Sequence, residues 1–256
     1  MPRQVATGLA LLFTAVLLAA PAHAVIKGSA SSLGSYTVRL AGNGYCTGVV
    51  IARRAVVTAA HCAHGMYVLA DNGSVRVIGV ARSAVLDDGR RVSVSGDAAI
   101  LKLAAPLSGV GAAPVGEGSG ERFTIAGYGT QDERERGAFG SLHEASLVAA
   151  GARALVDPNR SGSIGASACF GDSGGPVMRG GMLVGVITRA AHPSPRIACG
   201  DLTRWAAITV SGTAGEVATA SIEADTPAAE PRGRKVRRHA RRGFETETRS
   251  ASLFGD

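Results

Sequence analysis

Residues 45–62 read YCTGVVIARRAVVTAAHC and contain two short apolar runs, at residues 47–51 and 55–58. Both runs are rich in β-branched Val, Ile and Thr, whose side chains fit the pleated surface of a strand. Further runs of this kind lie at residues 36–40, 75–80, 92–94, 99–103, 123–126, 176–178 and 182–188. No helical periodicity is sustained before about residue 203. Many short strands at close spacing predict an all-β barrel or sandwich.

The composition agrees with this fold class. The chain has 256 residues, of which 46% are hydrophobic and 35 are Gly. The hydrophobic fraction excludes a wholly disordered protein, and the Gly content favours a turn-rich β protein over a helical bundle. Residues 104–118 (AAPLSGVGAAPVGEG) form the best internal boundary. We therefore expect two β-rich halves, at about residues 25–110 and 115–212.

The first 24 residues have the pattern of a secretory signal peptide. A positive start at Arg3 precedes the apolar residues 8–20, and Ala22-His23-Ala24 is a small-x-small cleavage site. The apolar run is too short to anchor the chain in a bilayer. We expect an exported protein, extracellular or periplasmic, without a membrane span, whose mature chain begins at or near Val25.

The C-terminal residues 213–256 differ in composition from the body. They hold 8 Lys/Arg and 7 Asp/Glu but almost no bulky apolar side chains. Such a segment cannot bury enough surface to offset its ordering entropy, so we expect a disordered charged tail. A dense basic run lies at residues 232–242. Two interpretations stay open: a solvated tail, or attraction to an anionic envelope polymer, a membrane or nucleic acid.

The cysteines indicate disulfide bonds. The chain has four of them: Cys46, Cys62, Cys169 and Cys199. In an oxidising compartment two disulfides are expected, and three pairings are possible. The local pairing would close two short loops, each contributing about 3 kcal/mol. A metal cluster around His61, Cys62 and His64 is the alternative, but no second Cys/His group lies at a zinc spacing, so we expect no metal and no cofactor.

Three segments together carry the chemistry: TAAHC at residues 58–62, DAAILKL at 97–103 and GDSGGP at 171–176. A serine hydroxyl is a weak nucleophile that needs a nearby base, and histidine suits that role at neutral pH. The imidazole in turn needs a carboxylate on its other nitrogen, and glycines let backbone N–H groups approach a developing oxyanion. Each requirement has a candidate in these motifs, in the chain order His61, Asp97, Ser173.

These motifs resemble those of the chymotrypsin/trypsin-like serine protease family, in a secreted member of bacterial type. Residues 45–51 (YCTGVVI) resemble the strand that carries the partner of the cysteine after the catalytic His. Residues 124–129 (TIAGYG) resemble the Gly-aromatic-Gly turn that opens the second barrel. The resemblance spans residues 25–210. It implies two antiparallel six-stranded β-barrels, with the active site in the cleft between them.

Carried onto this sequence, the resemblance implies a role for each group. Ser173 would be the nucleophile, His61 the general base and then acid, and Asp97 the residue that orients the imidazole. The N–H groups of Gly171 and Ser173 would form the oxyanion hole. Asp172 would be a buried carboxylate in need of a cation.

The family's partner for that carboxylate is a new N-terminal ammonium. Residues 25–28 (VIKG) resemble the family's mature start and begin where the signal peptidase would cut. We therefore expect export itself to release the activating group at Val25, to pair with Asp172. An arginine partner is the alternative.

Substrate preference stays open at this stage. The family's primary pocket is floored by the position of Ser167, which carries no charge and favours apolar or aromatic side chains. Asp201 could enter the pocket from its far wall and restore a preference for Arg or Lys. Thr188, Arg189 and Ala190 stand where the substrate-pairing strand is expected, and Arg189 would favour acidic substrate residues.

The sequence thus predicts a secreted serine endopeptidase that acts on protein or peptide substrates through an acyl-enzyme intermediate. Two alternatives come from other classes: a catalytically silent protease-like binding protein, and a protein that binds an anionic envelope polymer through its basic tail. Nothing in the sequence demands more than a monomer.

Overall fold

A computed structural model describes residues 24–42, 44–64, 67–70, 73–130, 139–161, 165–194 and 197–212. The chain divides into two units, Met1–Thr219 and Ala220–Asp256, and every described residue belongs to the first. Residues 1–23 of the predicted signal peptide and the predicted tail at residues 213–256 lie outside the described residues. The described part is built from β-strands and two short 3-10 segments, and none of its helices could cross a membrane.

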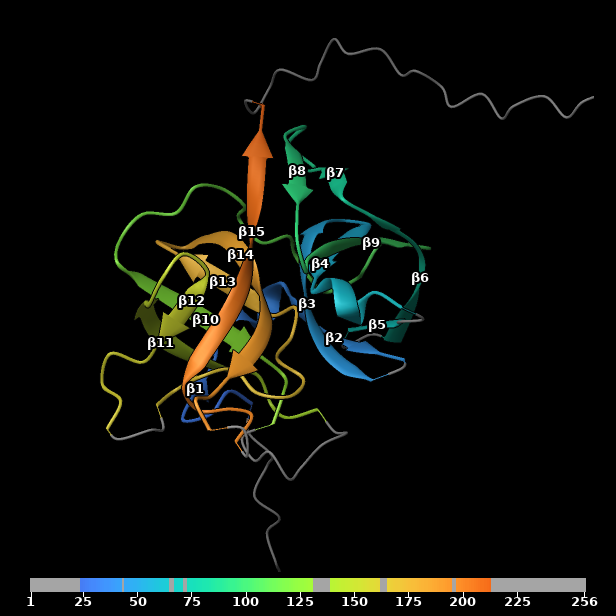
Figure 1. The fold of residues 1–256 in the computed structure, drawn as a ribbon. Coiled ribbons are helices and arrows are strands. Elements are labelled where there is room, and N and C mark those ends of the chain that lie inside the picture. Colours follow the sequence, from blue (N-terminus) through green and yellow to red (C-terminus); the bar gives the residue numbers. More distant parts are fainter. Residues whose placement is uncertain are drawn as a thin grey trace, which may run out of the picture. The chain divides into compact units, whose positions relative to one another are not determined.

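The first barrel closes six antiparallel strands in the order β2-β3-β4-β9-β6-β5. Its strands are β2 (Thr37–Ala41), β3 (Tyr45–Ala52), β4 (Ala55–Thr58), β5 (Tyr67–Ala70), β6 (Gly73–Ala81) and β9 (Ala99–Leu103). In Figure 1 these strands run from blue to green. The 3-10 segments η1 (Leu33–Ser35) and η2 (Ala60–Cys62) precede β2 and follow β4.

The second barrel is also closed by six antiparallel strands, through the pairs β10–β11, β11–β12, β12–β15, β15–β14, β14–β13 and β13–β10. Its strands are β10 (Arg122–Gly127), β11 (His143–Ala149), β12 (Ala154–Val156), β13 (Pro176–Arg179), β14 (Met182–Ala191) and β15 (Leu202–Ser211). The short β1 (Ser29–Ala30) pairs with β11.

One long strand joins the two halves. The far end of β15 leaves the second barrel and pairs with β8 (Arg91–Val94), which pairs with β7 (Ser83–Val85) (Figure 1). The predicted boundary at residues 104–118 falls between β9 and β10. Two antiparallel six-stranded barrels confirm the predicted fold class.

The strands β3 and β4 are apolar because both of their faces are buried. Val50 and Val56 pack inside the barrel, while their neighbours Val49 and Val57 pack in a second cluster with Val186 of the other barrel. A strand buried on both faces shows a continuous apolar run instead of polar alternation. One face of these strands fills the first barrel, and the other face packs against the second barrel. This packing holds the two barrels together and fixes the position of the cleft between them.

Candidate active site

The imidazole of His61 is held by Asp97. Thr58, the last residue of β4, pairs with Ala99, the first residue of β9. The segment η2 after β4 and the loop before β9 therefore lie at the same end of the barrel. The backbone N–H of His61 donates to Asp97 Oδ1 at 3.1 Å, and His61 Nδ1 lies 2.9 Å from Asp97 Oδ2. An ionised carboxylate can only accept, so Nδ1 donates to Asp97, and in the neutral imidazole Nε2 keeps its lone pair.

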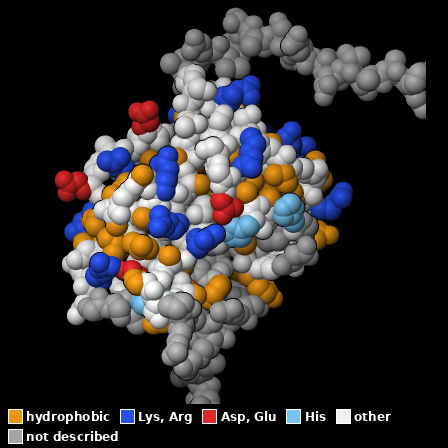
Figure 2. Space-filling model, viewed as in Figure 1, with side chains coloured by type: hydrophobic (Ala, Val, Ile, Leu, Met, Phe, Trp, Pro, Cys, Tyr) orange, Lys and Arg blue, Asp and Glu red, His pale blue; other side chains and the backbone are white. Residues whose placement is uncertain are grey.

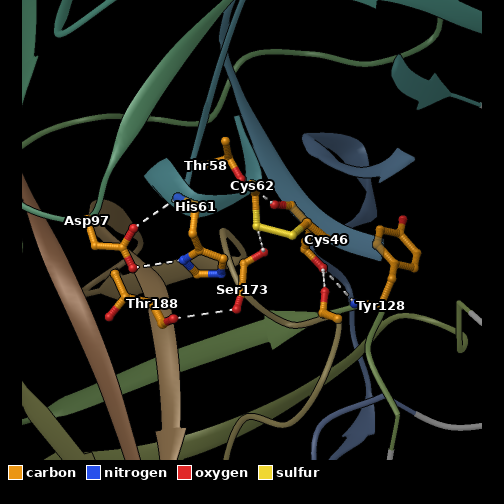
Figure 3. Close-up of a disulfide and its surroundings, with 10 residues drawn as sticks. Cys46, Thr58, His61, Cys62, Asp97, Tyr128, Ser173 and Thr188 are labelled. Atoms are coloured by element: carbon orange, nitrogen blue, oxygen red, sulfur yellow. Dashed lines mark hydrogen bonds and ion pairs between the residues drawn. A yellow bond between two sulfur atoms is a disulfide. The ribbon is translucent and has the colours of Figure 1, made fainter. Parts of the chain in front are cut away.

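Ser173 lies on the other side of that ring. Figure 3 shows the imidazole between Asp97 and Ser173. Ser173 Oγ donates to the carbonyl of Thr188 at 3.5 Å, and among the described residues no hydrogen bond joins it to His61. Such bonds are commonly long or misaligned before substrate binds. The His61 and Asp97 side chains are 49% and 41% exposed, so a substrate can reach the site.

The loop before Ser173 directs two N–H groups away from the protein. The carbonyl of Phe170 accepts a hydrogen bond from Thr130 N at 2.8 Å, and that of Asp172 accepts one from Gly175 N at 2.9 Å. In a planar trans peptide the N–H points opposite to the carbonyl. The N–H groups of Gly171 and Ser173 are therefore turned away from these contacts, and neither has a hydrogen-bond partner in the described part of the chain. This pair of donors can stabilise an oxyanion.

Asp172 is fully buried beneath this loop. Its carboxylate accepts hydrogen bonds from Gly129 N and Cys169 N, both at 2.8 Å, and from the N–H of Val25. Burial raises the pKa of Asp172 to about 7, against the opposing effect of these three donors. No arginine pairs with this carboxylate among the described residues. The structure thus brings the backbone N–H of Val25 to the carboxylate of Asp172.

A cleft of about 930 Å³ surrounds these groups. It is lined by Gly44, Tyr45, Cys46, His61, Asp97, Cys169, Phe170, Gly171, Ser173, Thr188, Arg189, Ala190, Ala198 and Cys199. Three of the four predicted substrate-binding residues, Thr188, Arg189 and Ala190, are among them. Figure 2 shows a face of the protein on which acidic and His side chains lie side by side, with Lys and Arg side chains around them.

Ser167 and Asp201 do not line the cleft. Ser167 is fully buried; its Oγ donates to the Ala168 carbonyl and accepts from Gly200 N at 2.7 Å. Asp201 is buried as well and forms an ion pair with Arg160, which lies 41 residues earlier in the chain. Arg160 was not predicted, because no motif links two loops that far apart in the sequence.

The cysteines form the disulfides Cys46–Cys62 and Cys169–Cys199, which confirms the expectation of disulfide bonds. Cys46, Cys62 and His61 offer atoms within 4.8 Å of one another. Both sulfurs are bound to each other, however, and a disulfide has no thiolate to offer a metal. The first disulfide instead ties η2, which carries His61, to β3.

Comparison with known proteins agrees with this geometry. The sequence profile of the trypsin family matches residues 25–199. The chain belongs to the trypsin family. Trypsin delta of Drosophila erecta is 24% identical over 223 residues, covering 71% of this chain and 86% of the fly protein. Trypsin alpha of the same species is 28% identical over 196 residues, covering 64% of this chain and 76% of that protein.

The fold is also that of known serine proteases. Neuropsin, a serine protease expressed in the limbic system of mouse brain, superposes with a TM-score of 0.51 at 20% identity, covering 72% of this chain and 92% of neuropsin. At that identity the likeness concerns the fold alone. Membership of the trypsin family indicates a serine protease hydrolase whose substrates are proteins.

Proposed function

We propose that this trypsin-family protein is an active, secreted serine endopeptidase. The observation that carries the proposal is the alignment of Asp97, His61 and Ser173 beside the two N–H groups of Gly171 and Ser173. A catalytically silent relative would be expected to lack one of these groups. Here all of them line one accessible cleft or its oxyanion site.

The reaction follows from these positions. Ser173 Oγ attacks the carbonyl carbon of a peptide bond as its proton passes to His61 Nε2. The N–H groups of Gly171 and Ser173 stabilise the resulting oxyanion, and Asp97 stabilises the imidazolium. His61 then gives its proton to the leaving amine, the C–N bond breaks, and an acyl-enzyme remains on Ser173. Water, deprotonated by His61, releases the acid and restores the serine.

We further propose that signal-peptide removal activates the enzyme. Ala24 and Val25 are both 0% exposed, so a protease cannot reach the bond between them once the chain has folded. Val25 also has a φ of +56°, which a β-branched residue rarely adopts because its side chain meets the preceding carbonyl. Cleavage before folding removes that carbonyl and leaves an ammonium where the Val25 N–H now meets Asp172.

The cleft favours apolar side chains at the residue before the cleaved bond. The hydroxyl of Ser167 is engaged in two hydrogen bonds, and the charge of Asp201 is neutralised by Arg160. A basic substrate side chain would therefore lose its water without gaining a free carboxylate. Because Asp201 lies outside the cleft lining, Arg160→Met should keep the wild-type preference for apolar side chains. A peptide-library profile compares the two proteins, and a shift toward Lys and Arg in the variant would place Asp201 in the pocket.

Labelling by a serine-directed fluorophosphonate tests the endopeptidase proposal. Wild-type protein should be labelled at Ser173 and should cleave a peptide library. Ser173→Ala should do neither, while the control Ser146→Ala, on the exposed face of β11, should match the wild type. A folded wild-type protein that is neither labelled nor active would instead be a silent binding protein.

Secretion, a monomeric state and the role of the tail complete the proposal. The signal-peptide pattern supports an extracellular or periplasmic location, and no cofactor is needed for the chemistry. The basic run at residues 232–242 supports binding of an anionic polymer. Truncation after Gly212 should abolish retention on an anionic polymer column and preserve proteolysis. Size-exclusion chromatography of the full-length protein should give the mass of one chain.

A further inference from the structure

Thr47 connects the nucleophile loop to both barrels. It lies near the start of β3, next to Cys46, and is 0% exposed. Its Oγ1 donates to the Gly171 carbonyl at 2.8 Å and accepts from Tyr128 N at 3.0 Å. Its backbone N–H donates to the Ser173 carbonyl at 2.9 Å. The hydroxyl has no further hydrogen to donate, so its one proton is committed to the loop.

The backbone carbonyl of Thr47 contacts the strand that precedes His61. This carbonyl accepts a hydrogen bond from Thr58 Oγ1 at 2.8 Å, and Thr58 ends the strand that leads to His61. Figure 3 labels Thr58, Tyr128 and Ser173, the residues that these hydrogen bonds of Thr47 connect. One buried residue therefore contacts the strand before the base, the turn at Tyr128 and the loop of the nucleophile.

The contact with Gly171 bears on the oxyanion site. Gly171 has a φ of +94°, and a residue without a side chain has little intrinsic preference for one backbone orientation. The peptide before it is held through the Phe170 carbonyl by Thr130 N. The peptide after it is held through its own carbonyl by Thr47 Oγ1. Both peptides that flank the Gly171 Cα are thus fixed, and its N–H is held toward the cleft.

We propose that the Thr47 hydroxyl is a positioning group of the oxyanion site, fixing the direction of the Gly171 N–H without touching the substrate. This inference rests on the proposed endopeptidase function. Valine has nearly the shape of threonine, so a role in packing alone would survive Thr47→Val. The positioning role would not, because this change removes both the donor to the Gly171 carbonyl and the Thr47 acceptor of the Tyr128 N–H.

The experiment compares Thr47→Val and Thr47→Ser with the wild type, using an apolar peptide substrate and a peptide boronate that forms a tetrahedral adduct on the serine. For Thr47→Val we expect kcat to fall about 10- to 100-fold with KM changed less than about twofold, and boronate affinity to fall in step with kcat. Thr47→Ser keeps the hydroxyl and should stay within about threefold of the wild type on both readouts.

Thr37→Val is the matched control. Thr37 is buried on β2, and its Oγ1 donates to the Leu33 carbonyl, away from the nucleophile loop. This variant should lower thermal stability and leave kcat and boronate affinity per labelled serine unchanged. Equal kcat in Thr47→Val and the wild type, or equal losses in Thr47→Val and Thr37→Val, would overturn the proposal.

Two further outcomes are decisive. If Thr47→Val does not fold, Thr47→Ala takes its place in the same comparison; failure of both to fold would overturn the proposal, since the hydroxyl would then be a folding requirement. A wild-type protein that fluorophosphonate does not label refutes the endopeptidase function itself. A labelled wild type with an insensitive Thr47→Val refutes only the positioning role.

Discussion

A single residue placed before Val25 should inactivate the enzyme. The buried carboxylate of Asp172 now meets only neutral N–H groups, and burial raises its pKa from 3.8 to about 7. That rise corresponds to about 4 kcal/mol against the ionised form. The native state therefore binds the extra proton, and stability falls as pH rises from about 4 to 7 and stays low above pH 7. An α-ammonium on Val25 would offset this cost through a buried ion pair.

The assay compares two proteins released from a fusion partner, one beginning at Val25 and one at Ala24. At pH 8 the rate of fluorophosphonate labelling should be about 100-fold lower for the form that begins at Ala24. The free energy of unfolding of this form should also fall progressively below that of the form that begins at Val25 as the pH rises from about 4 to 7. In an Asp172→Asn background the two forms should be equal, because no carboxylate remains to pair. Equal labelling rates of the two forms with Asp172 intact would refute this reasoning.

Three other changes should have distinct effects. Gly174→Ala would place a Cβ inside van der Waals contact with Thr58 Oγ1 at a φ of +84°, and should lower the free energy of unfolding by at least about 3 kcal/mol in chemical denaturation. Asp97→Asn should lower kcat about 10⁴-fold at unchanged fold, because the amide no longer holds His61 in the required tautomer; a near-normal rate would contradict the role of the carboxylate. Arg189→Glu should shift the peptide-library profile from acidic to basic residues near the cleaved bond, and an unchanged profile would remove Arg189 from the subsite.

The sequence predicted those parts of the structure that local patterns encode. The apolar runs that became β3, β4 and β9 were recognisable because both of their faces are buried. The strands β11, β12 and β15 were not predicted. In β15, for example, exposed Arg204 and Thr209 interrupt the apolar residues, so no continuous run appears. A strand with one solvated face carries a weaker signal than a fully buried one.

In the candidate active site, too, local patterns predicted some residues and missed those that act through distant contacts. The motifs around His61, Asp97 and Ser173 predicted residues that the fold brings into one cleft. The ion pair of Asp201 with Arg160 and the hydrogen bonds of Thr47 join segments 41 and 124 residues apart. Such contacts depend on how distant segments pack, which no local sequence pattern records. They concern substrate specificity and the positioning of the oxyanion site more than the chemical step itself.

The most direct test of the central claim is the detection of an acyl group on Ser173. Mixing the Val25-start protein with an activated apolar ester should release a burst of alcohol equal to the enzyme concentration, and intact mass spectrometry after an acid quench should find one acyl group, mapped by digestion to Ser173. The His61→Ala protein should show no burst. A wild-type protein that hydrolyses the ester without a burst, or carries the acyl group elsewhere, would contradict the account.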